Sequence, residues 1–219
     1  MYQPPHHRED DLGVQHALIR AHPLGLLITA GAEGPTANPL PFHLDAARGA
    51  KGTLQVHMAR ANGQWKELLV GAAPLVVFQG AENYITPSWY ATKRETGKVV
   101  PTWNYAMVQI KGKAAVIEDF DWLRRQIGAL TGDHEGKRAA PWAVEDAPDA
   151  FIAAQIKGIV GVEIEITDIF GKWKVSQNRP AADVAEVIEG LEQPDQPHVN
   201  AEMAELVREY GYRKREPKG

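Results

Sequence analysis

The sequence predicts an α+β protein built on an antiparallel β-sheet or barrel, with helices inserted between the strands and added after them. About seven segments rich in branched apolar residues and threonine are separated by Gly- and Pro-containing turns, which is typical of strands joined as hairpins. Helical apolar spacing is confined to a few segments and does not alternate regularly with the strands. The chain has no Gly-x-Gly-x-x-Gly and no Walker-type phosphate loop, which disfavours a dinucleotide fold.

The first half of the chain begins with a helix predicted over residues 11–22, where apolar residues recur at helical spacing and Pro23 ends the pattern. Turns such as AEGP and AARGAKG separate the segments that follow. A short helix is expected within 62–71, because Trp65, Leu68 and Leu69 have i, i+3, i+4 spacing. The predicted strands of this half occupy residues 24–31, 36–45, 53–59 and 73–80.

The second half continues with strands predicted over 83–89 and 102–119, followed by two helices over 119–135 and 148–160. Residues 160–177 alternate between apolar and charged side chains, which predicts a strand with a turn at Ile169–Gly171. Two more helices are expected at 180–191 and 200–211, joined by a Pro-rich linker. The prediction is therefore a main domain at 1–180 and a helical appendage at 181–219.

Composition narrows the class of protein. The 219 residues are 44% apolar and 24% charged, which is ordinary for a water-soluble globular protein, and no apolar run is long enough to span a bilayer. The N-terminal segment lacks the apolar region of a signal peptide, so a cytoplasmic protein with no membrane association is expected. The absence of cysteine excludes disulfides and thiolate ligands, and the net charge of −4 lowers the expectation of nucleic-acid binding.

The first candidate site is the predicted junction between the strand at 53–59 and the helix that follows. Arg60, Asn62 and Gln64 lie at this junction, and His57 lies just before them. A strand-to-helix junction offers free backbone N–H groups, and an arginine fork matches phosphate oxygens, so the junction suits an anion. The alternative is an ordinary helix N-terminus beside a surface arginine.

The second candidate site is the segment GKWKVSQNR at 171–179. Strand alternation places Lys172, Lys174 and Ser176 on one face and Trp173 on the other. Two cations and a hydroxyl on one face either line an anionic pocket or guard a solvated sheet edge. The hydrophilic stretch 91–100, between Trp89–Tyr90 and the Trp103 strand, is expected to be a mobile basic loop that could cover a cleft.

The remaining residues show no strong catalytic or metal motif. His6, His7, His16 and His22 fall outside an HExxH arrangement, and there is no Gly-x-Ser-x-Gly elbow. No metal ligand and no catalytic side chain is assigned. The histidines leave a haem or another planar anionic ligand, such as pyridoxal phosphate, as an alternative.

Several segments in the same order resemble one family over nearly the whole chain up to about residue 180. They are the opening MYQPPHHRED, the run VVPTWNY, the block HEGKRAAPWAVEDAPDAFI with the following IVGVEIEI, and GKWKVSQNR. Together they resemble the PaiB-like family, which is described as FMN-binding negative transcriptional regulators. The resemblance implies a split β-barrel related to pyridoxamine-phosphate oxidases and flavin reductases, forming a homodimer with FMN in clefts at the subunit interface.

The resemblance also implies which residues contact FMN. The phosphate would lie by His57, Arg60, Asn62 and Gln64. Many relatives carry Ser-x-Lys at positions 62 and 64, so here either Arg60 or a lysine elsewhere must supply the positive charge. Asn38 would lie beside the ring and ribityl chain. Trp103 and Asn104 would approach from the neighbouring subunit, with Lys172, Lys174 and Ser176 at the rim.

The sequence therefore predicts an FMN-binding split-barrel protein, either a flavin-dependent oxidoreductase or a flavin redox sensor that acts on transcription indirectly. A DNA-binding negative regulator is the alternative from a different class. No helix-turn-helix pattern is evident, and the acidic balance offers little for phosphate contacts along DNA.

Overall fold

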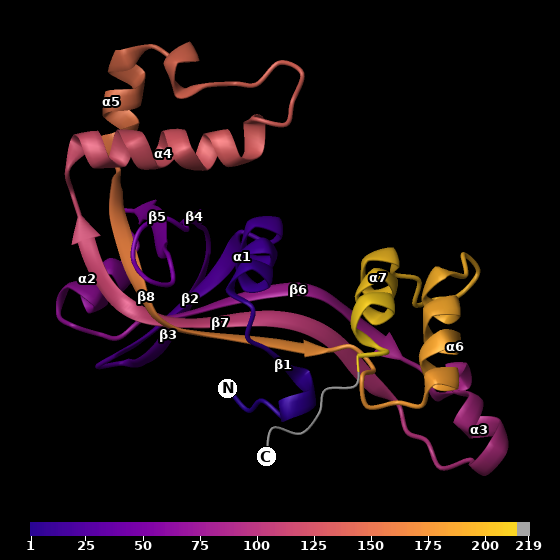
Figure 1. The fold of residues 1–219 in the computed structure, drawn as a ribbon. Helices are drawn as coiled ribbons and strands as arrows, with labels where there is room; N and C mark the ends of the chain where they lie inside the picture. The colour runs from indigo at the N-terminus through magenta and orange to yellow at the C-terminus, as the bar shows by residue number, and fades with distance from the viewer. Residues whose placement is uncertain (214–219) are drawn as a thin grey trace. The chain divides into compact units, whose positions relative to one another are not determined.

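The computed structural model describes residues 1–213 and contains helices and strands that alternate irregularly along the chain (Figure 1). The strands are β1 (Arg8–Glu9), β2 (Leu24–Gly31), β3 (Gly34–Pro41), β4 (His43–Asp45), β5 (Thr53–Ala59), β6 (Leu75–Ile85), β7 (Thr102–Ile117) and β8 (Ile159–Lys174). The α-helices are α1 (Leu12–Ala21), α2 (Gln64–Leu69), α3 (Ala91–Thr96), α4 (Phe120–Glu135), α5 (Asp149–Lys157), α6 (Ala181–Glu192) and α7 (Ala201–Tyr210). Short 3₁₀ helices are η1 (Pro5–His7), η2 (Pro87–Trp89) and η3 (Val144–Asp146).

The strands form one eight-stranded sheet in the order β3-β2-β6-β7-β8-β5-β4, and β1 pairs with β8. The pairings with a defined register are antiparallel, as the hairpin turns predicted. The predicted α+β class with an antiparallel sheet is therefore confirmed.

The chain divides by packing into two compact units. The terminal unit contains Met1–Asp11, Gln79–Val108 and the described residues from Phe170 onward. The central unit contains Leu12–Phe78 and Gln109–Ile169. Helices α6 and α7 pack together within the terminal unit, alongside the outer parts of β6, β7 and β8. The predicted boundary at residue 180 divides the chain differently and stays a prediction.

The central unit is organised by two strand pairings. The β2–β3 hairpin pairs from Leu24 with Pro41 to Gly31 with Gly34, and Gly34 has φ 109°, which a residue with a side chain rarely adopts. Along β2 the residues alternate between exposed and buried, with Leu27 fully buried. Strand β5 pairs with β8 along its whole length. These pairings place the β5–α2 junction next to the β2–β3 hairpin, because α2 packs on β2.

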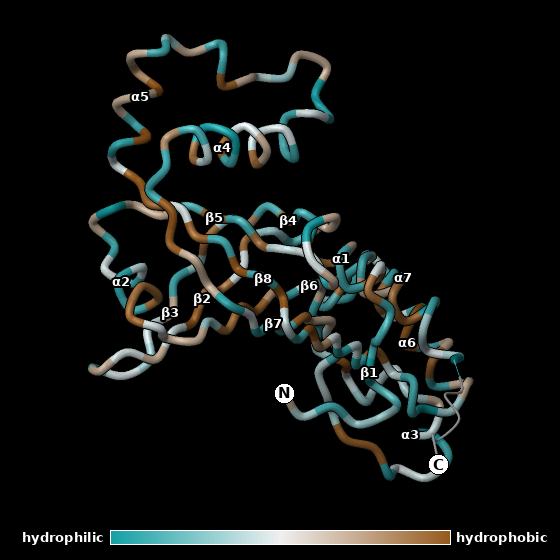
Figure 2. The backbone as a smooth tube through the Cα atoms, turned by 60° about the vertical axis from the view of Figure 1, so that its left-hand side comes forward, coloured by the Kyte–Doolittle hydropathy of each residue, from teal (hydrophilic) through white to brown (hydrophobic). Residues whose placement is uncertain are grey.

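Helix α4 begins where the sequence predicts. The Asp119 side chain accepts a hydrogen bond from the backbone N–H of Trp122 at 2.8 Å and so caps the helix. Figure 2 shows the mixture of hydrophilic and hydrophobic residues along α4. The hydrophobic ones pack against α5 and η3 in a small core made by Leu123, Val144, Ile152 and Ile156. Burial of one face is what holds this helix, since an isolated helix of this length is marginal in water.

The terminal unit is held by contacts between α3, α6, α7 and η2. Trp89 is buried against Gly190, where an added Cβ would lie 2.4 Å from the indole. Asn200 caps α7 by accepting from the backbone N–H of Met203 at 3.0 Å. Asp183 is fully buried and accepts from the Thr92 backbone N–H at 2.9 Å, which fastens α3 to α6.

Several local predictions are wrong. The strands predicted at 73–80 and 83–89 are a single strand, β6, and Pro87–Trp89 form η2 instead of strand. The turn expected at Ile169–Gly171 does not form, because β8 continues to Lys174 and Gly171 pairs with Glu9 of β1. The stretch 91–100 is not a simple loop, since residues Ala91–Thr96 form α3. Helix α3 ends at Gly97, whose φ of 69° is a common helix C-terminal conformation. Arg94 of α3 also makes a bidentate pair with Glu186 of α6.

Gly161 of β8 provides a test of packing in the central unit. An added Cβ would lie 2.2 Å from the Trp122 ring, whose Nε1 donates to Glu163 at 2.9 Å. We expect Gly161→Ala to lower the free energy of unfolding by about 1–3 kcal/mol, because the indole must move. Urea denaturation measures the change.

Gly128 in the interior of α4 is the matched control, because an added Cβ there meets nothing within 4 Å. Gly128→Ala is expected to raise the free energy of unfolding by up to about 1 kcal/mol through helix propensity. Equal denaturation midpoints for the two variants would contradict the packing described here.

Candidate functional site

The ten predicted site residues fall into two groups, one in each unit. Asn38, His57, Arg60, Asn62 and Gln64 belong to the central unit. The members in the terminal unit are Trp103, Asn104, Lys172, Lys174 and Ser176. Each group is described by its own contacts.

Gln64 is the centre of the first group. Its side chain is 2% exposed, and its Oε1 accepts from Asn38 Nδ2 of β3 at 2.9 Å. Its Nε2 donates to the Leu27 carbonyl of β2 at 3.0 Å and to Thr29 Oγ1 at 3.1 Å. The amide therefore ties α2 to the β2–β3 hairpin. Buried amides need such partners, since an unpaired polar group in the interior is costly.

Glu67 extends the same network along α2. Its carboxylate accepts from the Thr29 hydroxyl and, at 3.3 Å, from Thr36 Oγ1. An added Cβ at Gly31 would lie 2.9 Å from the Glu67 carboxyl carbon, so the hairpin passes close to this side chain. No spacing signal points to Glu67, because its partners Thr29 and Thr36 lie 38 and 31 residues earlier in the chain.

Each of the three guanidinium nitrogens of Arg60 already has a partner within the protein. It forms an ion pair with Glu118, its Nε donates to the Lys157 carbonyl at 3.2 Å, and its Nη2 donates to the Ile159 carbonyl at 3.2 Å. Asn62 Oδ1 accepts from the Gln64 backbone N–H at 3.1 Å. These contacts stabilise the junction between β5 and α2, and the Glu118 carboxylate balances the charge of Arg60. The role of these residues in anion binding stays a prediction.

His57 lies on β5, and its Nδ1 is 2.7 Å from Gln126 Oε1 of α4. Gln126 is 1% exposed, and its Nε2 has no hydrogen-bond partner among the described residues. No motif points to Gln126, which is a lone glutamine within an amphipathic helix.

In the terminal unit, Asn104 and Ser176 are brought together. Asn104 Nδ2 donates to Ser176 Oγ at 2.9 Å, and both side chains are buried. Ser176 has φ 67°, a left-handed conformation that non-glycine residues rarely adopt. This conformation turns the chain directly after β8, and the Arg179 backbone N–H donates to the Ser176 carbonyl at 3.0 Å.

Lys172 and Lys174 lie on β8 just before this turn. Lys174 Nζ donates to the Thr102 hydroxyl and to the Trp103 carbonyl of β7. Burial, and then the charges of Lys172 and Arg179, lower the pKa of Lys174. Lys172 is 9% exposed, and its ammonium lies 5.3 Å from the Tyr105 ring centroid and 5.5 Å from that of Tyr2.

Trp103 is 51% exposed and belongs to an aromatic patch with Tyr84 and His198. The Tyr84 ring centroid lies 6.0 Å from that of Trp103 and 5.0 Å from that of His198. These residues line an open depression of about 550 Å³ together with Glu82 and Asn83. The Asn83 amide donates to the His198 carbonyl at 3.1 Å, which positions the segment after α6. Tyr84 and His198 had no signal in the sequence, because the strand β6 and a loop more than 100 residues later meet only in the fold.

His7 and Arg179 are further polar residues of the terminal unit. Arg179 ends the predicted segment 171–179, whereas His7 was assigned to no site. His7 is buried, and its Nδ1 has no hydrogen-bond partner among residues 1–213. Burial, then His6 and the two lysines, lower the pKa of His7 to about 4 against a hydrogen bond with Gln177 that raises it. The Arg179 guanidinium carbon lies 4.3 Å from the Tyr90 ring centroid.

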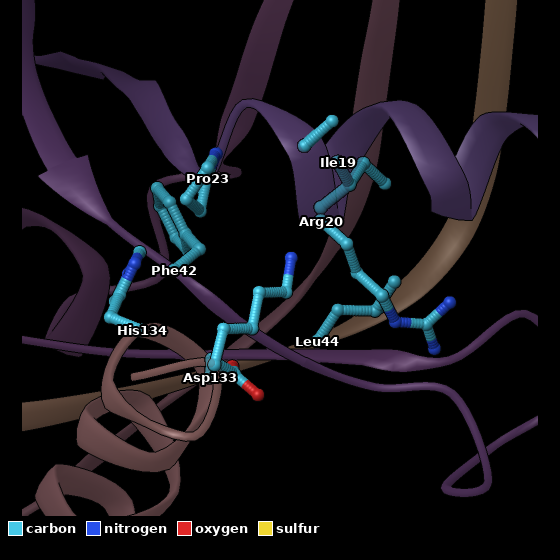
Figure 3. A pocket seen from close by; sticks show the side chains of 9 residues that line it. Ile19, Arg20, Pro23, Phe42, Leu44, Asp133 and His134 are labelled. Atoms are coloured by element: carbon cyan, nitrogen blue, oxygen red, sulfur yellow. The ribbon is translucent and has the colours of Figure 1, made fainter. Parts of the chain in front are cut away.

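A separate cavity of about 410 Å³ lies in the central unit and includes none of the predicted residues (Figure 3). Its apolar walls come from Ile19 of α1, Phe42 and Leu44, while Asp133 and His134 approach from α4 (Figure 3). The Asp133 carboxylate is 2.6 Å from His43 Nδ1. The cavity lies at the C-terminal ends of α1 and α4, where backbone carbonyls face outward.

The described part of the chain has neither a metal-binding cluster nor a membrane-spanning helix. No group of three or more His, Cys, Asp or Glu side chains there could hold a metal ion. No helix among residues 1–213 is both long enough and apolar enough to cross a membrane.

Comparison with known families and proteins is informative over most of the chain. A family described as "Putative FMN-binding domain" matches residues 1–168. Protease synthase and sporulation protein PAI 2 of Bacillus subtilis is 30% identical over 209 residues, covering 95% of this chain and 97% of that protein. A protein of Aspergillus fumigatus is 34% identical over 257 residues, covering 96% of this chain and 98% of its own length.

Solved structures share the fold at low sequence identity. The FAD and heme binding protein of Mycobacterium smegmatis superimposes with a TM-score of 0.57 at 16% identity, covering 76% of this chain and 73% of that one. A flavocytochrome of Azotobacter vinelandii gives a TM-score of 0.51 at 17% identity, covering 76% of this chain and 68% of that one. The predicted split-barrel fold is therefore confirmed.

The lowered pKa of His7 predicts how stability depends on pH. The folded pKa of about 4 lies below the ordinary 6.5, so between these values the unfolded chain binds a proton that the folded chain does not. The free energy of unfolding should therefore fall as pH decreases from 6.5 to 4, with a His7 contribution of up to about 1.4 kcal/mol per pH unit.

Urea denaturation of wild type and His7→Gln at several pH values tests this. The two curves should run parallel above neutral pH, and the variant should lose less stability on acidification. Identical slopes below pH 6.5 would show that His7 titrates normally in the folded protein.

Proposed function

The chain belongs to the FMN-binding domain family that matches residues 1–168, and on this premise we propose that it is a homodimeric, cytoplasmic FMN-dependent redox protein. It acts either as an oxidoreductase on a small molecule or as a flavin redox sensor. The observation that carries the proposal is the exposed Trp103 with Tyr84 and His198, next to lysines on β8. A flat aromatic surface beside positive charge matches a flat ring that carries a phosphate.

The residues of the terminal unit fit the parts of FMN. The aromatic patch has an open depression of about 550 Å³, where the exposed Trp103 indole offers a face for a planar ring. Lys174 donates to the Trp103 carbonyl, so its ammonium group lies beside the backbone of a residue of the aromatic patch. The hydrogen bond between the Asn104 and Ser176 side chains links β7 to the turn after β8. These are the residues that would hold FMN from this unit.

In the central unit, most polar atoms of the predicted site residues are already bonded within the unit. Asn38 is half-buried and uses its amide nitrogen on Gln64, which leaves its Oδ1 without a described partner. Gln64, Asn62 and Arg60 are engaged within the unit. We propose that they shape the junction by the β2–β3 hairpin, and that the positive charge for the phosphate comes from a lysine elsewhere.

Bound FMN would supply hydride or electron transfer at its ring, and the chain supplies binding and orientation. Trp103 would limit access of water to one face of the ring. Positive charge on Lys172 or Lys174 would favour a negatively charged, reduced cofactor over the neutral one. No side chain in either group is positioned as an obvious acid or base, so specificity would rest on which molecule reaches the ring.

An apolar sheet face supports the homodimer. Leu24 and Leu26 of β2 are 66% and 36% exposed, and Leu26 pairs with Val77 of β6. Ile28 continues the same face next to Leu75. Contiguous exposed apolar surface of this kind marks interaction sites, and a closed pair of identical subunits is the commonest assembly.

The Bacillus subtilis relative is named for protease synthesis and sporulation, which is the support for a regulatory role. We propose that any such role here is indirect and depends on the state of the flavin. The chain carries a net charge of −4, and helices α6 and α7 are separated by residues 193–200 rather than by the short turn of a helix-turn-helix.

Trp103→Ala is the sharpest test of flavin binding. Loss of the stacking surface should weaken FMN binding by roughly tenfold, as base–aromatic stacking of 1–3 kcal/mol suggests. Titration of flavin fluorescence against apoprotein measures the dissociation constant, and light scattering of the same samples reports whether the protein is a dimer.

Trp142→Ala is the matched control, because Trp142 is 47% exposed and belongs to the central unit outside the predicted groups. It should bind FMN as the wild type does. Equal weakening in both variants, or no flavin binding by folded wild type, would refute the proposal.

The proposed indirect role predicts that the protein does not bind an operator. The wild-type protein, loaded with FMN or free of it, should cause no sequence-specific retardation of its own promoter fragment in a mobility-shift assay at physiological salt. Specific retardation that survives competitor DNA would establish the operator-binding alternative.

A further inference from the structure

A group of cations in the terminal unit forms no ion pair with any carboxylate of residues 1–213. The cationic cluster consists of Lys172, Lys174 and Arg179, with His7 beside them. Within residues 1–213 none of the three cations forms an ion pair with a carboxylate: Lys172 and Arg179 lie against aromatic rings, and Lys174 donates to neutral oxygens. Charged groups that leave bulk water are usually paired, so this arrangement needs an explanation.

The cluster does not reflect a shortage of acids in the terminal unit. Arg94 is bidentate to Glu186, and Arg208 pairs with Glu192 at 2.6 Å and also with Glu205. These exposed arginines lie on the helices, where ion pairs contribute little. The less exposed cations of the cluster are the ones left without acids.

Lys172 is the clearest member. It is 9% exposed, yet its ammonium has only the ring faces of Tyr2 and Tyr105 as described partners. A lysine ammonium has three donors, and ring faces satisfy them poorly. An oxyanion beside Lys172 would accept these donors and offset the repulsion between Lys172 and Lys174 that lowers the Lys174 pKa.

Neutral groups that can donate to an oxygen accompany the cations. His7 Nδ1 is buried without a partner, and the Ser176 hydroxyl uses its oxygen to accept from Asn104, which leaves its hydrogen free to donate. The acidic side chains of this region are otherwise occupied. Asp183 accepts from Thr92, and Glu9 accepts from the Asp11 backbone N–H at 3.0 Å.

We propose that the cationic cluster, Lys172, Lys174 and Arg179 with His7, is a binding site for the phosphate group of a small molecule. Two lysines and an arginine match the charge of a phosphate monoester better than that of a single carboxylate. Strand β8 and the turn at Ser176 hold the lysines and Arg179 on a short stretch of chain. The phosphate comes either from FMN itself or from a separate phosphorylated ligand.

The experiment compares FMN, riboflavin and inorganic phosphate as probes of the purified full-length chain. Lys172→Met and Lys174→Met each remove one charge and keep an unbranched side chain. Lys172→Met is the independent variant, because Lys174 also holds Thr102 and the Trp103 carbonyl. Lys98→Met is the control, since Lys98 is an exposed lysine of the same unit. Circular dichroism and thermal denaturation verify that each variant is folded.

If the phosphate is that of FMN, wild type should bind FMN more tightly than riboflavin. Each cluster variant should then weaken FMN binding by about tenfold or more, the loss of one charge-assisted hydrogen bond, and weaken riboflavin binding less, so that the preference for FMN over riboflavin falls. If the phosphate belongs to another molecule, the preference for FMN should survive the substitutions, while inorganic phosphate should raise the melting temperature of wild type and Lys98→Met but not of the cluster variants.

Either result supports a phosphate site at the cationic cluster and identifies which molecule carries the phosphate. The proposal is overturned if folded Lys172→Met and Lys174→Met match wild type in both the FMN-to-riboflavin ratio and the response to inorganic phosphate. This inference stands apart from flavin binding, because the phosphate arm still reports on the cluster if neither flavin binds.

Discussion

The backbone hydrogen bonds of β8 are the constraint on which both units depend. In the central unit this strand pairs with β5 from Ile159 to Glu165, and in the terminal unit its Gly171 and Lys172 pair with β1. Strand pairing fixes which side chains share a face, because successive residues alternate. One uninterrupted strand therefore sets the packing of Gly161 against Trp122 as well as the positions of Lys172 and Lys174.

The two groups of predicted site residues differ in how their polar atoms are satisfied. In the central unit, Gln64 and Arg60 have protein partners, so their hydrogen bonds and charge support the fold around the β5–α2 junction. In the terminal unit, Lys172 has no hydrogen-bonding partner among the described residues, and Trp103 exposes half of its surface. Unsatisfied donors and exposed aromatic surface are costly to keep without a ligand, which makes the terminal unit the better candidate for recognition.

The candidate site was only partly accessible to sequence reasoning. Strand alternation predicts one shared face for Lys172 and Lys174, because their spacing within β8 is local. It does not extend to Ser176, which follows the strand with φ 67°. Tyr84, His198 and His7 were missed, since none carries a motif and each meets its neighbours only through contacts between distant segments. Arg60 was considered for binding the phosphate because of its place at a strand-to-helix junction, which is a local feature. Its ion pair with Glu118, 58 residues later, leaves no local signal in the sequence.

Local sequence patterns were enough to predict the α+β class, most helix and strand positions and the family, because apolar periodicity, caps and turn residues act within a few neighbours. They failed at Gly171, where pairing with β1 keeps the strand extended, and at Ala91–Thr96, where contacts with α6 stabilise a short helix. Which polar groups find hydrogen-bond partners, and which do not, became visible only in the folded protein. That distinction depends on burial and on partners far along the chain, and neither quantity is encoded in local spacing.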